Sequence, residues 1–174
     1  MTIYRFRILL DHSEDILRDI EIDSTVSFMD FHEMIIKSLG YSGLEMASFF
    51  MSNEDWDKGE EIALMDMAEP GQDAVKAMSD TRLNEMVTEK GDKMLFVYDF
   101  LRMWIYYVEL VAILNESDGK DLPKVVLAVG TPPNENADPQ IDMNDFDSYD
   151  EDDEYDDEFG DGSEFESLDD YPDL

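Results

Sequence analysis

The sequence predicts an α+β protein with a mainly antiparallel sheet of about six or seven strands, one long helix packed on a sheet face, and one short helix. Three observations lead to this prediction. Several segments alternate apolar and polar residues with the two-residue period of a half-buried strand. One segment carries helix signals at both of its ends. After residue 133 the composition changes to acidic residues with scattered aromatics.

A β-hairpin is predicted over residues 3–23. Arg5 and Arg7 share the polar face of its first strand, and Asp19 and Glu21 share the polar face of its second strand. Opposite charges that face each other across antiparallel strands contribute roughly 0.2–1 kcal/mol per pair. We therefore expect the two arginines to pair with the two carboxylates.

A helix is predicted over residues 28–39. Ser27 is suited to cap its first turn, with Asp30 three residues later as in a capping box. Gly40 stands where a helix commonly ends in a left-handed residue. The apolar positions recur at spacings of three, four and four residues, which places them on one face: Phe28, Phe31, Ile35 and Leu39.

The rest of the body contains mainly strands. Consecutive strands with few intervening helices favour an antiparallel sheet. The predicted strands cover residues 47–52, 61–67, 93–100, 104–112 and 122–129, with a loop over 68–79 and a short helix over 81–89.

The charge of the chain restricts its partners. The net charge is −33, Lys124 is the last basic residue, and 18 of the 45 acidic residues lie in 138–174. Phosphate backbones and anionic membranes attract lysine and arginine, so direct binding to nucleic acid or to a membrane surface is disfavoured. A basic protein is the partner that the charge favours.

The predicted organisation is a compact domain over residues 1–133 and an acidic tail over residues 134–174. The tail has too little hydrophobicity to offset the entropy of ordering, so we expect it to be largely disordered when free. It is either an interaction tail or a solubilising extension. Its aromatic residues have no regular spacing: Phe146, Tyr149, Tyr155, Phe159, Phe165 and Tyr171.

The sequence also indicates a location. It has no cysteine, and its first residues lack the charged and apolar regions of a signal peptide. No apolar run is long enough to span a membrane. We expect a cytoplasmic protein, and the sequence does not determine its oligomeric state.

Residues with evident chemistry are few, and we assign no catalytic, cofactor-binding or metal-binding residue. His12 is predicted in a turn, and His32 is predicted on the helix, at the boundary between its buried and exposed faces; neither belongs to a zinc-binding pattern. A calcium-loop pattern beginning at Asp157 fails, because apolar residues occupy two ligand positions. Asp99, between two aromatics at a strand end, is expected to cap a turn or accept a backbone N–H.

Several stretches together resemble the plasmid pRiA ORF-three-like family. The resemblance covers about residues 1–135 and excludes the tail. It implies a single α+β domain and no established activity. Some members carry a resolvase-like label as passengers of insertion elements, but this chain has no nucleophile among arginines. The similar stretches are Tyr4–Ile8, Phe28–Ile35, Gly91–Phe100 and Trp104–Leu110.

The chain departs from the family pattern at three places. Leu101 and Arg102 stand where many members have Gly-Asp, and Tyr106 stands where many have histidine. Residues 131–135, Thr-Pro-Pro-Asn-Glu, replace a Cys-Pro-Pro-Glu-Asp stretch. If these positions form a polar or metal-binding site in relatives, this chain lacks the residues of that site. The resemblance therefore transfers the fold and no site.

Three functions remain open. The first is a non-catalytic interaction or adaptor protein whose acidic, aromatic tail contacts a basic partner. The second is an enzyme or small-ligand binder with an unfamiliar site near Asp99, Trp104 and Tyr106. The third is an accessory factor of a mobile genetic element that acts through a basic DNA-binding partner.

Overall fold

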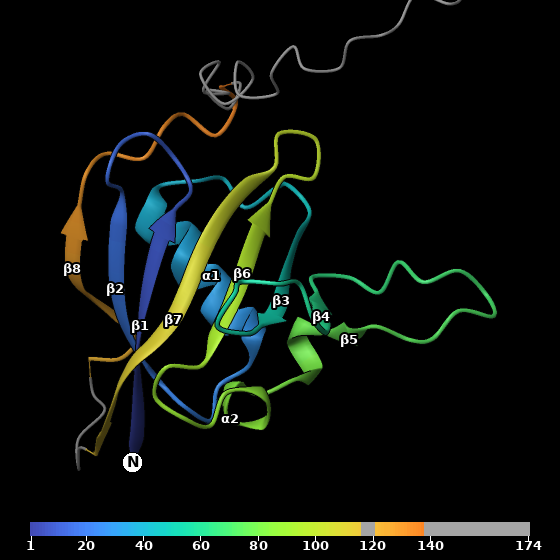
Figure 1. The fold of residues 1–174 in the computed structure, drawn as a ribbon, viewed down its shortest axis with the longest axis horizontal. Coiled ribbons are helices and arrows are strands. Elements are labelled where there is room, and N and C mark those ends of the chain that lie inside the picture. The colour runs from blue at the N-terminus through green and yellow to red at the C-terminus, as the bar shows by residue number, and fades with distance from the viewer. Residues whose placement is uncertain (116–120, 138–174) are drawn as a thin grey trace, which may run out of the picture. The chain divides into compact units, whose positions relative to one another are not determined.

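The computed structural model describes residues 1–115 and 121–137. They form an eight-stranded sheet with few helices, in the strand order β5-β4-β3-β6-β7-β1-β2-β8 (Figure 1). Every neighbouring pair of strands is antiparallel except β4 and β5. The elements are β1 (Thr2–Leu10), β2 (Leu17–Asp23), α1 (Phe28–Leu39), β3 (Ala47–Ser52), β4 (Glu61–Ala63), β5 (Lys76–Ala77), the 3-10 helix η1 (Met78–Asp80), α2 (Leu83–Met86), β6 (Lys93–Tyr98), β7 (Trp104–Asn115) and β8 (Lys124–Val129).

The predicted α+β class is confirmed, but the predicted number of strands is too low. The additional strand is β5, which pairs with β4 over two residues inside the predicted loop. β4 ends at Ala63 and α2 covers four residues, so both are shorter than expected. The sequence also suggests Thr81 as the cap of this short helix, but the N-cap is Arg82, no side chain caps the helix, and the Thr81 hydroxyl donates to the Ala77 carbonyl. The lengths of these short elements are determined by pairing between segments that are distant in the sequence. Such pairing leaves no periodic pattern of apolar residues that could predict it.

The helix α1 has the capping residues that the sequence predicts. The Ser27 hydroxyl accepts from the backbone N–H of Asp30 at 3.1 Å, and the Asp30 carboxylate accepts from the backbone N–H of Ser27 at 3.0 Å. Gly40 ends the helix at φ 71°. Its left-handed conformation favours glycine, which has no Cβ to clash. In the part of the chain that the structure describes, no helix is long and apolar enough to cross a membrane.

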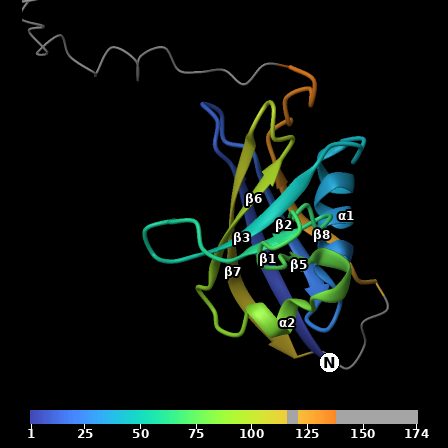
Figure 2. The same ribbon diagram turned by 90° about the vertical axis from the view of Figure 1, so that its right-hand side faces the viewer.

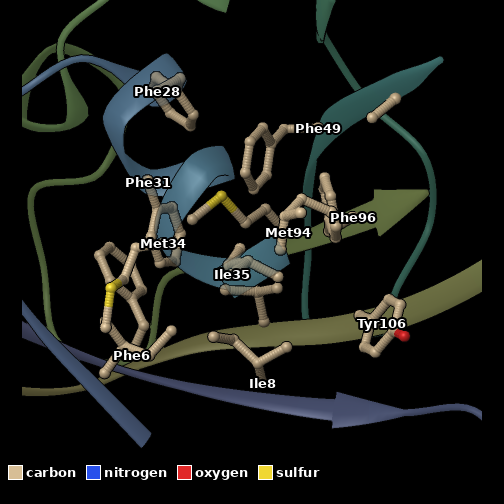
Figure 3. Close-up of a cluster of buried hydrophobic side chains, with 14 of the residues drawn as sticks. Phe6, Ile8, Phe28, Phe31, Met34, Ile35, Phe49, Met94, Phe96 and Tyr106 are labelled. Carbon is tan, nitrogen blue, oxygen red and sulfur yellow. The ribbon is translucent and has the colours of Figure 1, made fainter. Parts of the chain in front are cut away.

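The apolar face of α1 packs on one face of the sheet (Figure 2). Phe31 lies 4.5 Å from Phe6 and 5.5 Å from Phe49 between ring centroids. Phe49 lies 4.8 Å from Phe96, so the rings connect α1 with β1, β3 and β6 (Figure 3). All four rings are fully buried. Full burial of such a side chain contributes roughly 1.5–3 kcal/mol, which makes this cluster the centre of the fold.

Ion pairs on the opposite face confirm the pairing expected for the hairpin. Arg7 binds Asp19 through two hydrogen bonds of 2.9 Å, and the Arg5 Nε donates to Glu21 at 3.0 Å. The two carboxylates are only 6% and 4% exposed, although they lie on the predicted polar face of the strand. The longer arginine side chains cover them. Lys124 of β8 lies 3.5 Å from Glu21 and extends this charged row.

Candidate functional site

The three residues at which the sequence placed a possible site lie at one end of the sheet, around the turn between β6 and β7. Asp99 begins the turn at φ 62°, and Met103 ends it at φ 57°. Asp99 is 2% exposed. Its carboxylate accepts the backbone N–H groups of Leu101 at 3.0 Å and Arg102 at 3.2 Å. The prediction that Asp99 caps a turn is confirmed.

The charge state of Asp99 follows from these contacts. Burial by itself would raise the pKa of its carboxyl group. The backbone N–H groups and the guanidinium of Arg102, 3.2 Å from Oδ2, outweigh burial and hold the pKa below its usual range. Asp99 is therefore a stable anion that holds the turn, since all of its hydrogen bonds stabilise the charged form.

Trp104 and Tyr106 point from β7 to the buried side of the sheet. The Trp104 Nε1–H donates to the backbone carbonyl of Glu135 at 3.0 Å. The Tyr106 hydroxyl donates to the hydroxyl of Tyr41 at 3.1 Å. Burial, with the contact to Tyr41, raises the pKa of Tyr106 strongly, so this phenol stays neutral. Tyr41 in turn stacks on Tyr98, with ring centroids 5.5 Å apart.

Glu135 joins this group from the segment that follows β8. Its carboxylate accepts from the Tyr98 hydroxyl at 2.8 Å, from the Ser42 backbone N–H at 2.8 Å and from the Ser42 hydroxyl at 2.9 Å. Burial would raise the pKa of Glu135, but these bonds lower it below its usual range. We call Tyr41, Ser42, Tyr98, Tyr106 and Glu135 the tyrosine–glutamate cluster.

The cluster brings together the places where the chain departs from the family pattern. Tyr106 belongs to it directly, and Glu135 belongs to the replaced stretch 131–135. Arg102 lies in the adjoining turn, which connects Tyr98 with its cross-strand partner Trp104. The sequence singled out Asp99, Trp104 and Tyr106 but missed Glu135. The chain contains many acidic residues, and the partners of this one are 37 and 93 positions away.

A small cavity opens beside Trp104. Its volume is about 230 Å³, and it is lined by His12, Glu14, Ile16, Trp104, Thr131, Pro133 and Ala137. Pockets for small molecules commonly have volumes of roughly 300–1,000 Å³. Within residues 1–115 and 121–137, no three acidic or histidine side chains are grouped as a metal ion would require. The arrangement stabilises the turn and the segment after β8, and it offers little space for a ligand.

His32 lies elsewhere and corrects a second expectation. It was predicted at the boundary between the buried and exposed faces of the helix, but it is 4% exposed and packs edge-on against Phe96, with ring centroids 5.8 Å apart. Neither ring nitrogen has a hydrogen-bond partner. Burial lowers its pKa to about 4. The signal was present in the sequence, because residue 32 lies four positions after Phe28 and three before Ile35, on the apolar face.

A larger cavity of about 500 Å³ lies between α1 and the segment that leads into β8. Its apolar wall includes Ile22, Met34, Leu122 and Pro123. The charged residues that line it are Asp23, Asp30, Glu33 and Lys37. No motif indicates this cavity, which we call the α1 groove. The tail aromatics and the tested calcium pattern lie outside the described residues.

The protein is an α+β domain built on a single mixed sheet. At one end of the sheet, the hydrogen bonds of the tyrosine–glutamate cluster join β6, β7, the loop after α1 and the segment after β8. The chain belongs to the family of plasmid pRiA4b ORF-3-like proteins, whose family model matches residues 2–165. The match extends beyond residue 135, where the similarity expected from the motifs ends, and includes most of the acidic tail.

A solved structure has the same fold. It is the crystal structure of a protein of unknown function from Methanosarcina mazei Go1, with a TM-score of 0.66 and 20% sequence identity. The similar region covers 79% of this chain and 75% of that one. A comparison with curated proteins finds no match.

Proposed function

We propose that this protein is a non-catalytic interaction protein that binds a basic partner, with the acidic, aromatic tail contacting that partner. The observation that carries the proposal is the distribution of charge. The net charge is −33, and no lysine or arginine follows Lys124. A surface with one sign of charge attracts the opposite sign and repels its own, which favours basic proteins and disfavours nucleic acid.

The chemistry of the cluster supports the proposal indirectly. Acid–base catalysis requires groups that can exchange a proton near neutral pH. Asp99 and Glu135 have pKa values below their usual range, and the pKa of Tyr106 is raised strongly. Each keeps one protonation state at neutral pH. Their hydrogen bonds are directed at the protein itself and not into the cavity beside Trp104.

The proposal is tested by affinity capture from the native cell with the full chain and with a chain that ends at residue 137. Both are used at low and at high salt. We expect the full chain to retain basic proteins at low salt, and we expect the shortened chain to lose most of them. A set of captured proteins that does not change on removal of residues 138–174 would exclude a role for the tail.

Two alternatives have their own tests. A ligand binder would use the cavity of about 230 Å³ beside Trp104, and its ligand would change the fluorescence of that residue. An accessory factor of a mobile element would compete with DNA for a basic DNA-binding partner. Competition at low salt would favour that factor over a general adaptor.

A further inference from the structure

The two edges of the sheet are built differently. β5 is two residues long, and its Lys76 lies 3.7 Å from Glu60. Short strands and lysine side chains protect a sheet edge from pairing with another chain. β8 has six residues and carries no charge after Lys124. Among the described residues, no strand lies beyond β8 (Figure 1).

The side chains of β8 are apolar on both faces of the sheet. Val125, Val126, Leu127 and Val129 are between 38% and 42% exposed. A run without alternation is typical of a strand covered on both faces, and not of an edge. A bulge between Asp19 and Ile20 interrupts the pairing with β2 but adds no charge. β8 thus has the composition of an inner strand in an edge position.

The register with β2 shows which residues face each side. Leu127 is opposite Asp19, and Val129 is opposite Leu17, so both lie on the face away from α1. Val125 is opposite Ile20, a core residue, and lies on the α1 side. A strand added to this edge would therefore place alternate side chains on an apolar row and on the side of α1.

The side of α1 carries acidic groups near the start of β8. The α1 groove is lined by Asp30 and Glu33 of the helix, together with Asp23 at the end of β2. Lys37 is the single basic residue in its lining. The groove adjoins β8 through Leu122 and Pro123. An added strand would thus meet negative charge on the side of α1.

We propose that β8 binds an extended segment of a basic protein by strand addition, with lysine or arginine on the α1 side and apolar side chains beside Leu127 and Val129. This inference rests on the proposed function and names its site. Strand addition satisfies the free backbone groups of an exposed edge, and side-chain positions give specificity. A second copy of the chain is disfavoured, because two chains each carrying a net charge of −33 repel one another.

The test uses the full chain and a capped octapeptide of alternating lysine and valine, with binding measured by calorimetry at physiological salt. A second peptide has the same side chains but an N-methyl group on every residue, which removes the N–H donors from both edges of the strand and prevents strand pairing. Leu127→Lys places a charge on the edge. Leu101→Lys is the matched control, because this substitution makes the same change of charge at a residue that is 92% exposed in the β6–β7 turn.

We expect Leu127→Lys to weaken binding by about tenfold or more relative to Leu101→Lys. We also expect the N-methylated peptide to bind the unchanged protein at least about tenfold more weakly than the parent peptide. Equal binding of the two peptides would overturn strand addition and leave the proposed function standing, because the tail alone would then explain the attraction. Failure of both peptides to bind would count against both proposals.

Two further outcomes are decisive. A loss of binding in Leu127→Lys counts only if its circular dichroism and thermal unfolding match those of Leu101→Lys, and the N-methylated peptide tests the proposal without any substitution. Sedimentation of the unchanged chain as a dimer that Leu127→Lys dissociates, with no competition from the peptide, would assign the edge to a second copy and overturn the proposal.

Discussion

The Tyr98 hydroxyl donates a 2.8 Å hydrogen bond to the carboxylate of Glu135, so residues on β6 and on the segment after β8 are joined across 37 positions of sequence. The same carboxylate accepts two more bonds from Ser42, in the loop after α1. One side chain thus ties together three separate parts of the fold.

Replacing Glu135 with alanine should destabilise the domain by roughly 1–3 kcal/mol, because it leaves the partly buried Tyr98 hydroxyl without an acceptor and removes both bonds to the exposed Ser42. The change is measured by urea unfolding at neutral pH. Glu89→Ala is the control, since Glu89 is exposed and its side chain has no partner among the described contacts. Equal unfolding midpoints for the two variants would show that the contact is not stabilising.

The contribution of Glu135 should also depend on pH. Its pKa is lowered in the folded protein, so its stabilisation is present above the unfolded pKa, about 4.3, and is lost as the pH falls through the folded value. Glu135→Gln removes this dependence. The stability difference between the unchanged protein and Glu135→Gln should therefore shrink on acidification below about pH 4. A difference that is constant with pH would contradict the assignment.

Asp99 allows its hydrogen bonds to be separated from its backbone conformation. Asp99→Ala should cost roughly 2–3 kcal/mol, because it removes the acceptor for two amides and places alanine at φ 62°. Asp99→Asn should cost less, since asparagine tolerates this conformation and keeps an acceptor. Asp99→Gly removes the acceptor, but glycine adopts a positive φ without strain. An order of stability other than Asn above Gly and Gly above Ala would contradict this role, as measured by thermal unfolding.

His32 should make the protein less stable as the pH falls. Its pKa is lowered by burial to about 4, and the unfolded value is about 6.5. Between these values the unfolded chain binds the proton and the folded chain does not, so up to roughly 3 kcal/mol of stability is lost on going from pH 6.5 to pH 4. The loss is absent above pH 6.5, where both states are neutral.

The measurement is the free energy of unfolding between pH 7.5 and pH 5, where most carboxylates remain ionised. His32→Leu should flatten the curve and should stabilise the protein at pH 5, because leucine has no unpaired ring nitrogens to bury. His12→Asn, at the partly exposed histidine of the first turn, is the control. Parallel curves for His32→Leu and the unchanged protein would exclude the buried histidine as the cause.

The pair of Arg7 and Asp19 should be stronger than an ordinary surface ion pair. Asp19 is 6% exposed, so Arg7→Ala leaves a buried carboxylate without its partner, at a cost of roughly 1–3 kcal/mol. The pair of Lys76 and Glu60, 3.7 Å apart and about half exposed on both sides, is the control. A double-mutant cycle should give a larger coupling for the first pair than for the second, which should be at most about 1 kcal/mol. Equal couplings would contradict this account.

The sequence predicted those parts of the fold that depend on neighbouring residues. Alternation identified β1, β2 and β7, and it also predicted the pairs of Arg7 with Asp19 and Arg5 with Glu21. The capping pattern identified the ends of α1 at Ser27 and Gly40. These features depend on periods of two or 3.6 residues and on local hydrogen bonds, so they can be recognised from the sequence.

Other features depend on contacts between distant segments. β5 exists only because two residues meet β4, and a pairing of that length has no pattern of its own. Glu135 was assigned to the tail from its position after Pro133, but its hydrogen bonds to Ser42 and Tyr98 connect it to the domain. Even α1 contained a residue that was misjudged, because His32 is polar although its position is on the apolar face.

The central claim is that the protein binds a basic partner through opposite charge. The most direct test is the affinity of the purified full chain for its captured partner, measured from about 50 to 500 mM salt, which changes the screening length from above to below 10 Å. We expect the affinity to fall steadily with salt, and we expect removal of residues 138–174 to weaken binding and to reduce that dependence. An affinity that does not change with salt, or the same dependence with and without the tail, would contradict the claim.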